Sequence, residues 1–246
     1  MRFNILHLKR IIVTSYNSAI YNGGGYYWDS NFATVDTKTI DISKEIEKDV
    51  RKLNGNGDFR SDECIELLKQ ADIVVTNPPF SLFGDFISML NNYEKDFIII
   101  GPLNCITLQK PFQMMINDRM RCGYHFETSG FLRPDGHVLT NHVSRSCWWF
   151  TSLQIDISYR HINLTETYSA IKYPKYDNAD AVEVSKKDLI PYDYDGVMGV
   201  PISFMKHYNP EQFVLIGNEK TMNIKGRCKI DGQLKYARLF IKNKTK

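Results

Sequence analysis

The chain has 246 residues, of which 43% are hydrophobic, and a formal net charge of +3. This length suits one large domain or a domain with an appendage, and the hydrophobic content excludes a chain that is disordered throughout. No apolar run approaches the ~20 residues of a membrane span. Because Lys9 and Arg10 interrupt the apolar stretch near Met1, we expect no signal peptide.

Five cysteines are scattered through the sequence, an odd number in which no two form a Cys-x-x-Cys pair. This usage favours free thiols in a reducing cytoplasm over disulfides, and it argues against a metal site. We therefore expect a cytoplasmic protein without a bound metal. The five are Cys64, Cys105, Cys122, Cys147 and Cys228.

The N-terminal part opens with a strand predicted over Ile11 to Ser15. Gly23-Gly24-Gly25 follows among aromatic residues. A glycine run can cradle phosphate, but this one lacks the G-x-G-x-x-G spacing, so a loop or hairpin turn is favoured. The pattern over Ser43 to Leu53 is compatible with a short helix, and Asn54-Gly-Asn-Gly57 then marks a break.

A strand–helix–strand unit is predicted next. Ser61 is suited to cap a short helix, and the β-branched residues of Ala71 to Thr76 indicate a buried strand. Apolar residues recur at helical spacing between Leu82 and Leu90, and Phe97 to Ile100 is a second continuous apolar strand. Two strands joined by a helix over about 30 residues predict a parallel sheet that is covered on both faces.

The pattern weakens in the second half of the chain. After Pro111 a helix is predicted as far as Gly123. Val138 to Asn141 and Cys147 to Thr151 have strand-like sequences, and we expect them to pair as an antiparallel hairpin at the sheet edge. From Tyr159 onward helices are few and the sequence is typical of a loop-rich region.

Positive charge is concentrated at the C-terminal end. From Lys220 to Lys246 there are nine Lys or Arg residues against one acid, Asp231, a net charge of +8, which leaves −5 for the remainder of the chain. A solvated basic tail and an arm that contacts phosphates both explain this pattern. Leu239-Phe-Ile241 within it is compatible with a strand.

The first strand of the strand–helix–strand unit ends in Asn77-Pro78-Pro79-Phe80. Ligands of open α/β sheets bind beyond the carboxyl ends of the strands. Two prolines remove two N–H donors, which leaves the Asn77 side-chain oxygen and the Pro78 carbonyl as outward acceptors. Two converging acceptors suit an exocyclic amine, and Phe80 offers a face for an aromatic ring. This pattern favours a site that methylates the amine of a flipped adenine.

Asp58-Phe59 lies nineteen residues before Asn77, in a predicted loop. An aspartate at such a position can accept a hydrogen bond from the adenine amine of a methyl donor, and Phe59 can cover the adenine ring. The dipeptide alone is a weak signal, and the downstream Asn-Pro-Pro-Phe strengthens it.

The chain resembles the EcoRI-type adenine-specific DNA methyltransferases from its first residues almost to Arg238. The Asn-Pro-Pro-Phe element is shared by many amino-methylating enzymes, whereas the longer strings are more specific to the family. The strings that carry the resemblance are GDFRSDEC (57–64), ADIVVTNPPFSLF (71–83), WFT (149–151), DGVMGVP (195–201) and YNPEQF (208–213).

The resemblance implies a site-specific enzyme that transfers a methyl group from S-adenosylmethionine to a flipped adenine of double-stranded DNA. The implied role is restriction–modification or the protection of phage or mobile-element DNA. A Rossmann-like sheet, mostly parallel, is implied for a catalytic core over residues 1–157, with a loop-rich target-recognition region over 158–246. The resemblance also implies that Asn77, Pro78, Pro79 and Phe80 hold the target adenine and that Asp58 and Phe59 contact the donor.

One departure from the family pattern concerns the beginning of the chain. Such enzymes begin with a strand and a loop for the methionine half of the donor, whereas this sequence starts at Met1-Arg-Phe-Asn, within the next helix by its pattern. Ile11 to Ser15 would then be the second strand of a parallel sheet. We therefore expect an upstream segment or a separate chain to supply the first strand, and we expect the 246-residue chain alone to bind the donor poorly.

Two other functions fit parts of the sequence. One is an amino-methyltransferase that acts on RNA or on a protein glutamine, because the same acceptors would serve it. The other is a truncated, catalytically inactive remnant that binds DNA.

Overall fold

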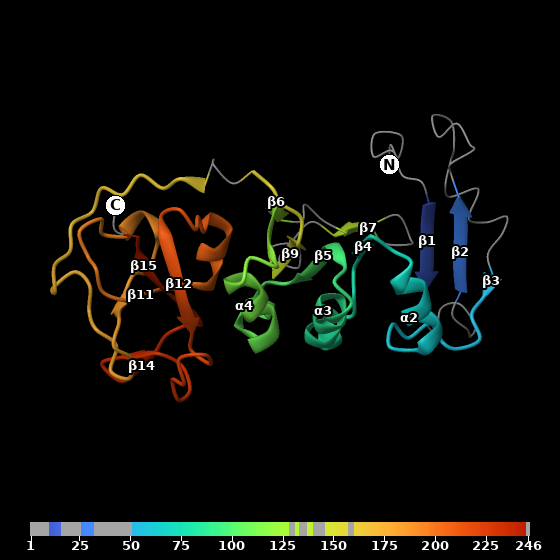
Figure 1. Cartoon of the computed structure of the whole chain (residues 1–246). Coiled ribbons are helices and arrows are strands. Elements are labelled where there is room, and N and C mark those ends of the chain that lie inside the picture. The colour runs from blue at the N-terminus through green and yellow to red at the C-terminus, as the bar shows by residue number, and fades with distance from the viewer. Residues whose placement is uncertain are drawn as a thin grey trace. The chain divides into compact units, whose positions relative to one another are not determined.

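The computed structural model describes residues 10–15, 26–31, 51–127, 131–132, 137–139, 146–156 and 160–244. The chain divides into two compact units, Met1–Asp72 and Ile73–Lys246, and each is described by itself (Figure 1). The glycine run Gly23–Gly25 and most of the helix suggested over Ser43 to Leu53 lie outside the described residues.

The first unit contains a small antiparallel sheet with the order β1-β2-β3. The strand predicted over Ile11 to Ser15 is confirmed as β1 (Arg10–Ser15). It pairs antiparallel with β2 (Tyr26–Asn31), which pairs in turn with β3 (Arg51–Lys52). The expectation that β1 belongs to a parallel sheet is therefore wrong within this unit. Arg51 and Lys52 lie within the range suggested for a helix, but they form a short strand instead, because they pair with β2.

Helix α2 (Asp62–Lys69) follows in the same unit. The predicted cap is confirmed, because the Ser61 hydroxyl accepts a hydrogen bond from the Cys64 backbone N–H at 3.3 Å. The Glu63 carboxylate accepts from the Asn54 backbone N–H at 2.9 Å. The loop between Asn54 and Ser61 is thus tied to the helix at both ends.

The second unit begins with the predicted strand–helix–strand element, which is confirmed. β4 (Ile73–Thr76) and β5 (Asp96–Pro102) pair in parallel, with Val75 opposite Ile98, and α3 (Phe83–Asn92) connects them. Two further strands, β6 (Arg121–Glu127) and β9 (Cys147–Thr151), complete a sheet with the order β4-β5-β9-β6. Both pair antiparallel with their neighbours, so the architecture is mixed α/β, and the expectation of a mostly parallel sheet is wrong for this sheet, in which only β4 and β5 pair in parallel.

The predicted edge hairpin is wrong. β9 lies between β5 and β6, whereas the short β8 (Val138–Leu139) pairs with β7 (Phe131–Leu132). The reason is burial, because Trp148 and Phe150 of β9 are almost fully enclosed and a strand of that kind has neighbours on both sides.

The helix predicted from Pro111 to Gly123 is too long at its C-terminal end. α4 (Gln109–Ile116) stops where Asp118 adopts a positive φ of 55°, and the chain then enters β6. Helices α3 and α4 contact each other beside β5 (Figure 1). Leu82, the first of the apolar residues predicted at helical spacing, precedes α3 and is only partly buried, whereas the other four are buried: Phe83, Phe86, Ile87 and Leu90.

Strand β4 is less buried than its sequence indicates. Ile73 and Val75 are 46% and 58% exposed, so the expectation of a buried strand is wrong for this face. Position explains the difference, because β4 is the end strand of the sheet in the described part of the chain, and Phe97 and Ile99 of β5 are buried on the opposite face.

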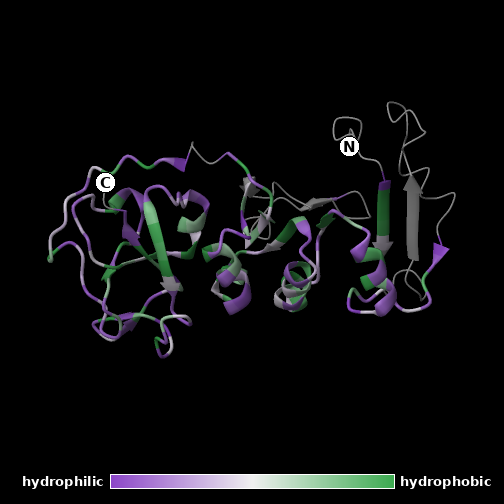
Figure 2. Ribbon diagram, in the orientation of Figure 1, coloured by the Kyte–Doolittle hydropathy of each residue, from purple (hydrophilic) through white to green (hydrophobic). Residues whose placement is uncertain are grey.

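The C-terminal part of the second unit is built from strands and 3₁₀ turns, without an α-helix between residues 160 and 244. Its four-stranded sheet has the order β10-β11-β15-β12, and a separate hairpin follows β12. Figure 2 shows β12 as hydrophobic along most of its length. The strand suggested at Leu239–Ile241 is confirmed within β15. The bounds are β10 (Val182–Glu183), β11 (Met198–Pro201), β12 (Phe213–Asn218), β13 (Lys229–Ile230), β14 (Gln233–Leu234) and β15 (Arg238–Asn243).

Two polar contacts join the C-terminal part of the second unit, residues 160–244, to the part that contains the β4–β6 sheet. The buried Arg160 guanidinium donates to the carbonyls of Cys122 and Gly123 at 3.0 and 3.1 Å. The Asn218 side chain donates to the Ile106 carbonyl at 3.4 Å, and Ile106 lies in the 3₁₀ turn η4 (Leu103–Thr107). The remaining 3₁₀ turns are η3 (Phe80–Leu82), η7 (Lys187–Leu189) and η8 (Ile202–His207).

All five cysteines lie outside disulfides and are buried. Among the described helices, none combines the length and the apolar character needed to cross a membrane. The described residues also contain no group of three or more His, Cys, Asp or Glu placed to hold a metal ion.

Candidate active site

The loop after β4 presents an open acceptor at the carboxyl end of the strand. Asn77 is exposed, and its side chain forms no hydrogen bond with the described part of the chain. Pro78 is buried, whereas Pro79 is exposed and extended, with φ −61° and ψ 123°. The Pro79 carbonyl accepts from the Leu82 N–H at 3.0 Å, which closes the turn into η3. The Asn77 amide is therefore held at a strand end without a hydrogen-bond partner among the described residues.

Phe83 anchors the other end of this loop. Its side chain is fully buried and meets Phe150 edge to face, with ring centroids 6.1 Å apart. Gly101 of β5 makes room for the Phe83 ring, because a Cβ at that position would lie only 2.3 Å from the Phe83 Cε2 atom. The loop thus joins β4 to the start of α3, and Phe83 packs the start of this helix against the sheet.

Phe80 stands at the start of η3, between the prolines and this anchor. Its side chain is 40% exposed, unlike the buried phenylalanines at positions 83 and 86 of the following helix. An aromatic ring exposed beside a strand end offers a stacking surface for another flat ring.

The Asp58 carboxylate has a different environment. Arg60 donates from Nε to Oδ1 at 2.9 Å and from a terminal nitrogen to Oδ2 at 2.7 Å, and its backbone N–H also reaches Oδ1 at 2.9 Å. The pKa of the Asp58 carboxyl is lowered to about 2, first by the side-chain hydrogen bonds of Arg60 and then by its backbone bond. Asp58 is therefore ionised at any physiological pH.

Phe59 shares the same arginine. The Arg60 guanidinium carbon lies 5.4 Å from the centre of the Phe59 ring, in cation–π geometry. The Asp58 side chain keeps 23% of its surface exposed. One carboxylate oxygen, Oδ2, accepts a single bond in this arrangement and retains a lone pair for a further donor.

The structure brings the predicted site residues together in two groups. Asn77, Pro78, Pro79 and Phe80 form one loop of the second unit, and Asp58 and Phe59 form one loop of the first. Sequence reasoning missed Arg60 and Gly101. The Asp-x-Arg spacing could have indicated the first, whereas the role of Gly101 depends on a contact between distant residues.

Comparison with known proteins identifies the family of this chain. The family model described as adenine-specific methyltransferase EcoRI matches residues 1–244. The type II methyltransferase M.EcoRI of Escherichia coli is 38% identical over 99% of this chain and 80% of its own length. Type II methyltransferases of Mycoplasma genitalium (M.MgeORF184P) and Mycoplasma pneumoniae (M.MpnI) are 36% and 34% identical, each over 87% of this chain and 68% of their own length. No solved structure gives a significant match.

All three relatives are methyltransferases, which defines the class of protein to which this chain is similar. Within that class the chain belongs to the EcoRI family of adenine-specific methyltransferases, because the family model spans nearly its whole length. The resemblance inferred from the sequence strings is confirmed.

Proposed function

We propose that this protein transfers a methyl group from S-adenosylmethionine to the exocyclic amine of an adenine in double-stranded DNA. In this proposal Asn77, Pro78, Pro79 and Phe80 hold the target adenine, after the base has left the duplex. The biological role would be restriction–modification or the protection of phage or mobile-element DNA.

The observation that carries the proposal is the open Asn77 amide at the carboxyl end of β4. An exposed acceptor that forms no hydrogen bond within the described chain is ready for a ligand donor, and the two prolines after it cannot compete as donors. An adenine amine has two N–H groups and suits the Asn77 oxygen together with the Pro78 carbonyl.

The chemistry needs these acceptors because the adenine amine is a poor nucleophile, with its lone pair delocalised into the ring. Acceptors that hold both N–H bonds favour a tetrahedral nitrogen and return the lone pair to it. Positioning and electrostatic preorganisation of this kind supply much of the rate in enzymes. The exposed Phe80 ring offsets part of the cost of unstacking the base.

The donor end of the proposal concerns Asp58 and Phe59. S-adenosylmethionine, when bound, supplies a methyl group on a sulfonium, which needs no further activation. The Asp58 carboxylate fits the donor's adenine amine because it is permanently ionised and retains a lone pair on Oδ2. Phe59 would cover the adenine ring of the donor, and the Arg60 guanidinium already lies over the Phe59 ring.

The C-terminal region from residue 158 would contact DNA and recognise the target site. Support comes from its charge, since the segment from Lys220 to Lys246 carries +8 in a chain of +3. Phosphate contacts of lysine and arginine supply most of the sequence-independent affinity of such proteins.

The test is methyl transfer from isotopically labelled S-adenosylmethionine to plasmid DNA, to structured RNA and to a glutamine-containing protein acceptor in parallel. The proposal expects label in DNA, recovered as N6-methyladenine after digestion to nucleosides. Label in RNA or protein instead would favour one of the other amino-methyltransferases. DNA binding without transfer to any acceptor would point to an inactive remnant.

A further inference from the structure

The basic segment from Lys220 to Lys246 contains the β13–β14 hairpin, whose turn is Asp231-Gly232. Both turn residues have positive φ, 51° and 75°, as a two-residue type I′ turn requires. Lys229 lies opposite Leu234, and Ile230 lies opposite Gln233. Because residues alternate between the two faces of a strand, the hairpin has an inner and an outer face.

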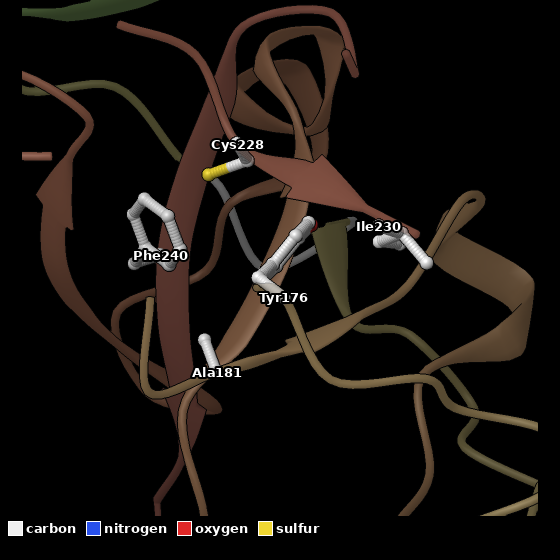
Figure 3. Packing of buried hydrophobic residues seen from close by; sticks show 5 residues of the cluster. All are labelled: Tyr176, Ala181, Cys228, Ile230 and Phe240. Atoms are coloured by element: carbon white, nitrogen blue, oxygen red, sulfur yellow. The ribbon is translucent and has the colours of Figure 1, made fainter. Parts of the chain in front are cut away.

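The inner face is packed into the protein. Cys228 and Ile230 are buried, and they form an apolar cluster with Tyr176, Ala181 and Phe240 (Figure 3). Phe240 belongs to β15, so the hairpin is attached directly to the C-terminal sheet.

Main-chain hydrogen bonds hold the hairpin in place as well. The Asp177 carboxylate accepts from the N–H groups of Asp231 and Gly232 at 3.2 and 2.8 Å. The Asn178 side chain accepts from the Lys229 N–H and donates to the Arg227 carbonyl, both at 3.0 Å. The turn and the base of the hairpin are thus fixed by side chains of a separate loop, independently of the outer face.

The outer face is formed by Arg227, Lys229, Leu234 and Tyr236, all exposed. Leu234 is 64% exposed and Tyr236 is 83% exposed. Two apolar side chains held out on a fixed element, next to two cations on the paired side of the hairpin, indicate a binding surface rather than a solvated loop. Arg238, the first basic residue after Tyr236, is excluded from this face because it is buried in an ion pair with Glu183 at 2.7 Å.

The combination suits a partner that is anionic at its rim and apolar between its charges. A groove of duplex DNA has this character, with phosphates on both edges and flat bases with thymine methyl groups in its floor. A two-stranded β-ribbon also fits the width of the major groove, whereas the deep, narrow major groove of duplex RNA does not admit it.

We propose that the outer face of the β13–β14 hairpin enters the major groove of duplex DNA. Arg227 and Lys229 contact phosphates, and Leu234 and Tyr236 contact base edges. This assignment rests on the proposed function, since it identifies the element by which the methyltransferase would hold its substrate.

The test measures binding of a fluorescein-labelled, mixed-sequence DNA duplex by the full chain across a range of salt concentrations, without methyl donor. Replacing both cations (Arg227→Gln with Lys229→Gln) should lower the slope of log K against log salt by about 0.9 per lost phosphate contact. Tyr236→Ala should weaken binding about tenfold and leave the slope unchanged, as expected for a lost apolar contact with base edges in the groove.

Matched controls come from exposed residues outside the hairpin. Lys110→Gln removes an exposed cation and Tyr93→Ala removes an aromatic side chain that is 37% exposed, both before residue 158, and neither should change the slope or the affinity. The charge-preserving pair Arg227→Lys with Lys229→Arg should restore the wild-type slope. Thermal unfolding of every variant should match the wild type, because the altered side chains point away from the core.

Wild-type affinity and slope in both hairpin variants would overturn the assignment, as would equal losses in binding a duplex RNA of the same length. The two proposals fail separately. If the hairpin variants methylate and bind DNA normally, only the hairpin assignment is wrong. If the wild type binds duplex DNA through the hairpin but transfers no methyl group to it, only the proposed function is wrong.

Discussion

The loops that carry Asp58 and Asn77 differ in how their oxygen acceptors are occupied. Arg60 engages both oxygens of Asp58, whereas the Asn77 side chain has no hydrogen-bond partner in the described chain. A charge needs compensation when no ligand is bound, and an amide does not. The comparison indicates that the proposed donor loop is preorganised by its own arginine, whereas the proposed target loop would be completed by its ligand.

The largest expected effect comes from the open acceptor. Asn77→Ala should lower the rate of methyl transfer about 10²–10³-fold, the usual loss for one preorganised transition-state contact. Thermal stability should stay unchanged because Asn77 is exposed. The control is Asn92→Ala, an exposed asparagine at the end of α3. Near-normal turnover of the Asn77 variant would show that the loop does not hold the target base.

Phe80→Ala should weaken DNA binding by about 1–3 kcal/mol through lost stacking of the flipped base. Affinity for S-adenosylmethionine, titrated separately, should be unchanged. Tyr93→Ala is the matched control, because Tyr93 is 37% exposed and Phe80 is 40% exposed. A loss of affinity for S-adenosylmethionine without a loss of DNA binding would show that Phe80 contacts the donor and not the target adenine.

Asp58→Asn should weaken donor binding about tenfold, since a hydrogen bond to a charged group is worth about 1.5–3 kcal/mol and an amide retains part of it. Calorimetry of the full chain with S-adenosylmethionine measures this change. Asp62→Asn, an exposed acid of the first turn of α2, should leave the affinity unchanged. Equal affinities of the Asp58 variant and the wild type would contradict the assignment of the donor loop.

The smallest effect concerns Arg60. In the wild type the folded pKa of Asp58 is depressed to about 2, so donor binding through this carboxylate should not vary above about pH 4. Arg60→Gln should raise that pKa toward the ordinary value of about 3.9, and donor affinity should then begin to fall below about pH 5. Affinity curves of the two proteins that coincide down to pH 4 would show that Arg60 does not control Asp58.

The sequence predicted the parts of the fold that depend on neighbouring residues. Helix α3 and its flanking strands follow from apolar spacing, and the Ser61 cap follows from local hydrogen bonding. The position of β9 between β5 and β6 could not be predicted, because it depends on which distant strands bury Trp148 and Phe150. The antiparallel pairing of β1 with β2 depends likewise on the partner and not on the strand's own sequence.

The same distinction applies to the site. The residues after β4 were predicted because prolines and an asparagine at a strand end restrict the backbone in a recognisable way. The bonds from Arg60 to Asp58 and the space that Gly101 leaves for Phe83 were not predicted. Such features change the charge state and the position of the site residues without changing their identity.

The attachment of the β13–β14 hairpin by the Asp177 carboxylate has a consequence for how this protein can evolve. The carboxylate binds the hairpin through main-chain N–H groups, and the apolar anchor uses only inward side chains. The four outward positions therefore contribute little to folding, and mutations there are expected to change stability by no more than about 0.5 kcal/mol. If the hairpin enters DNA as proposed, a lineage could exchange Leu234 or Tyr236 and acquire a preference for a different DNA sequence, while the fold and the chemistry proposed for the loop after β4 are inherited intact.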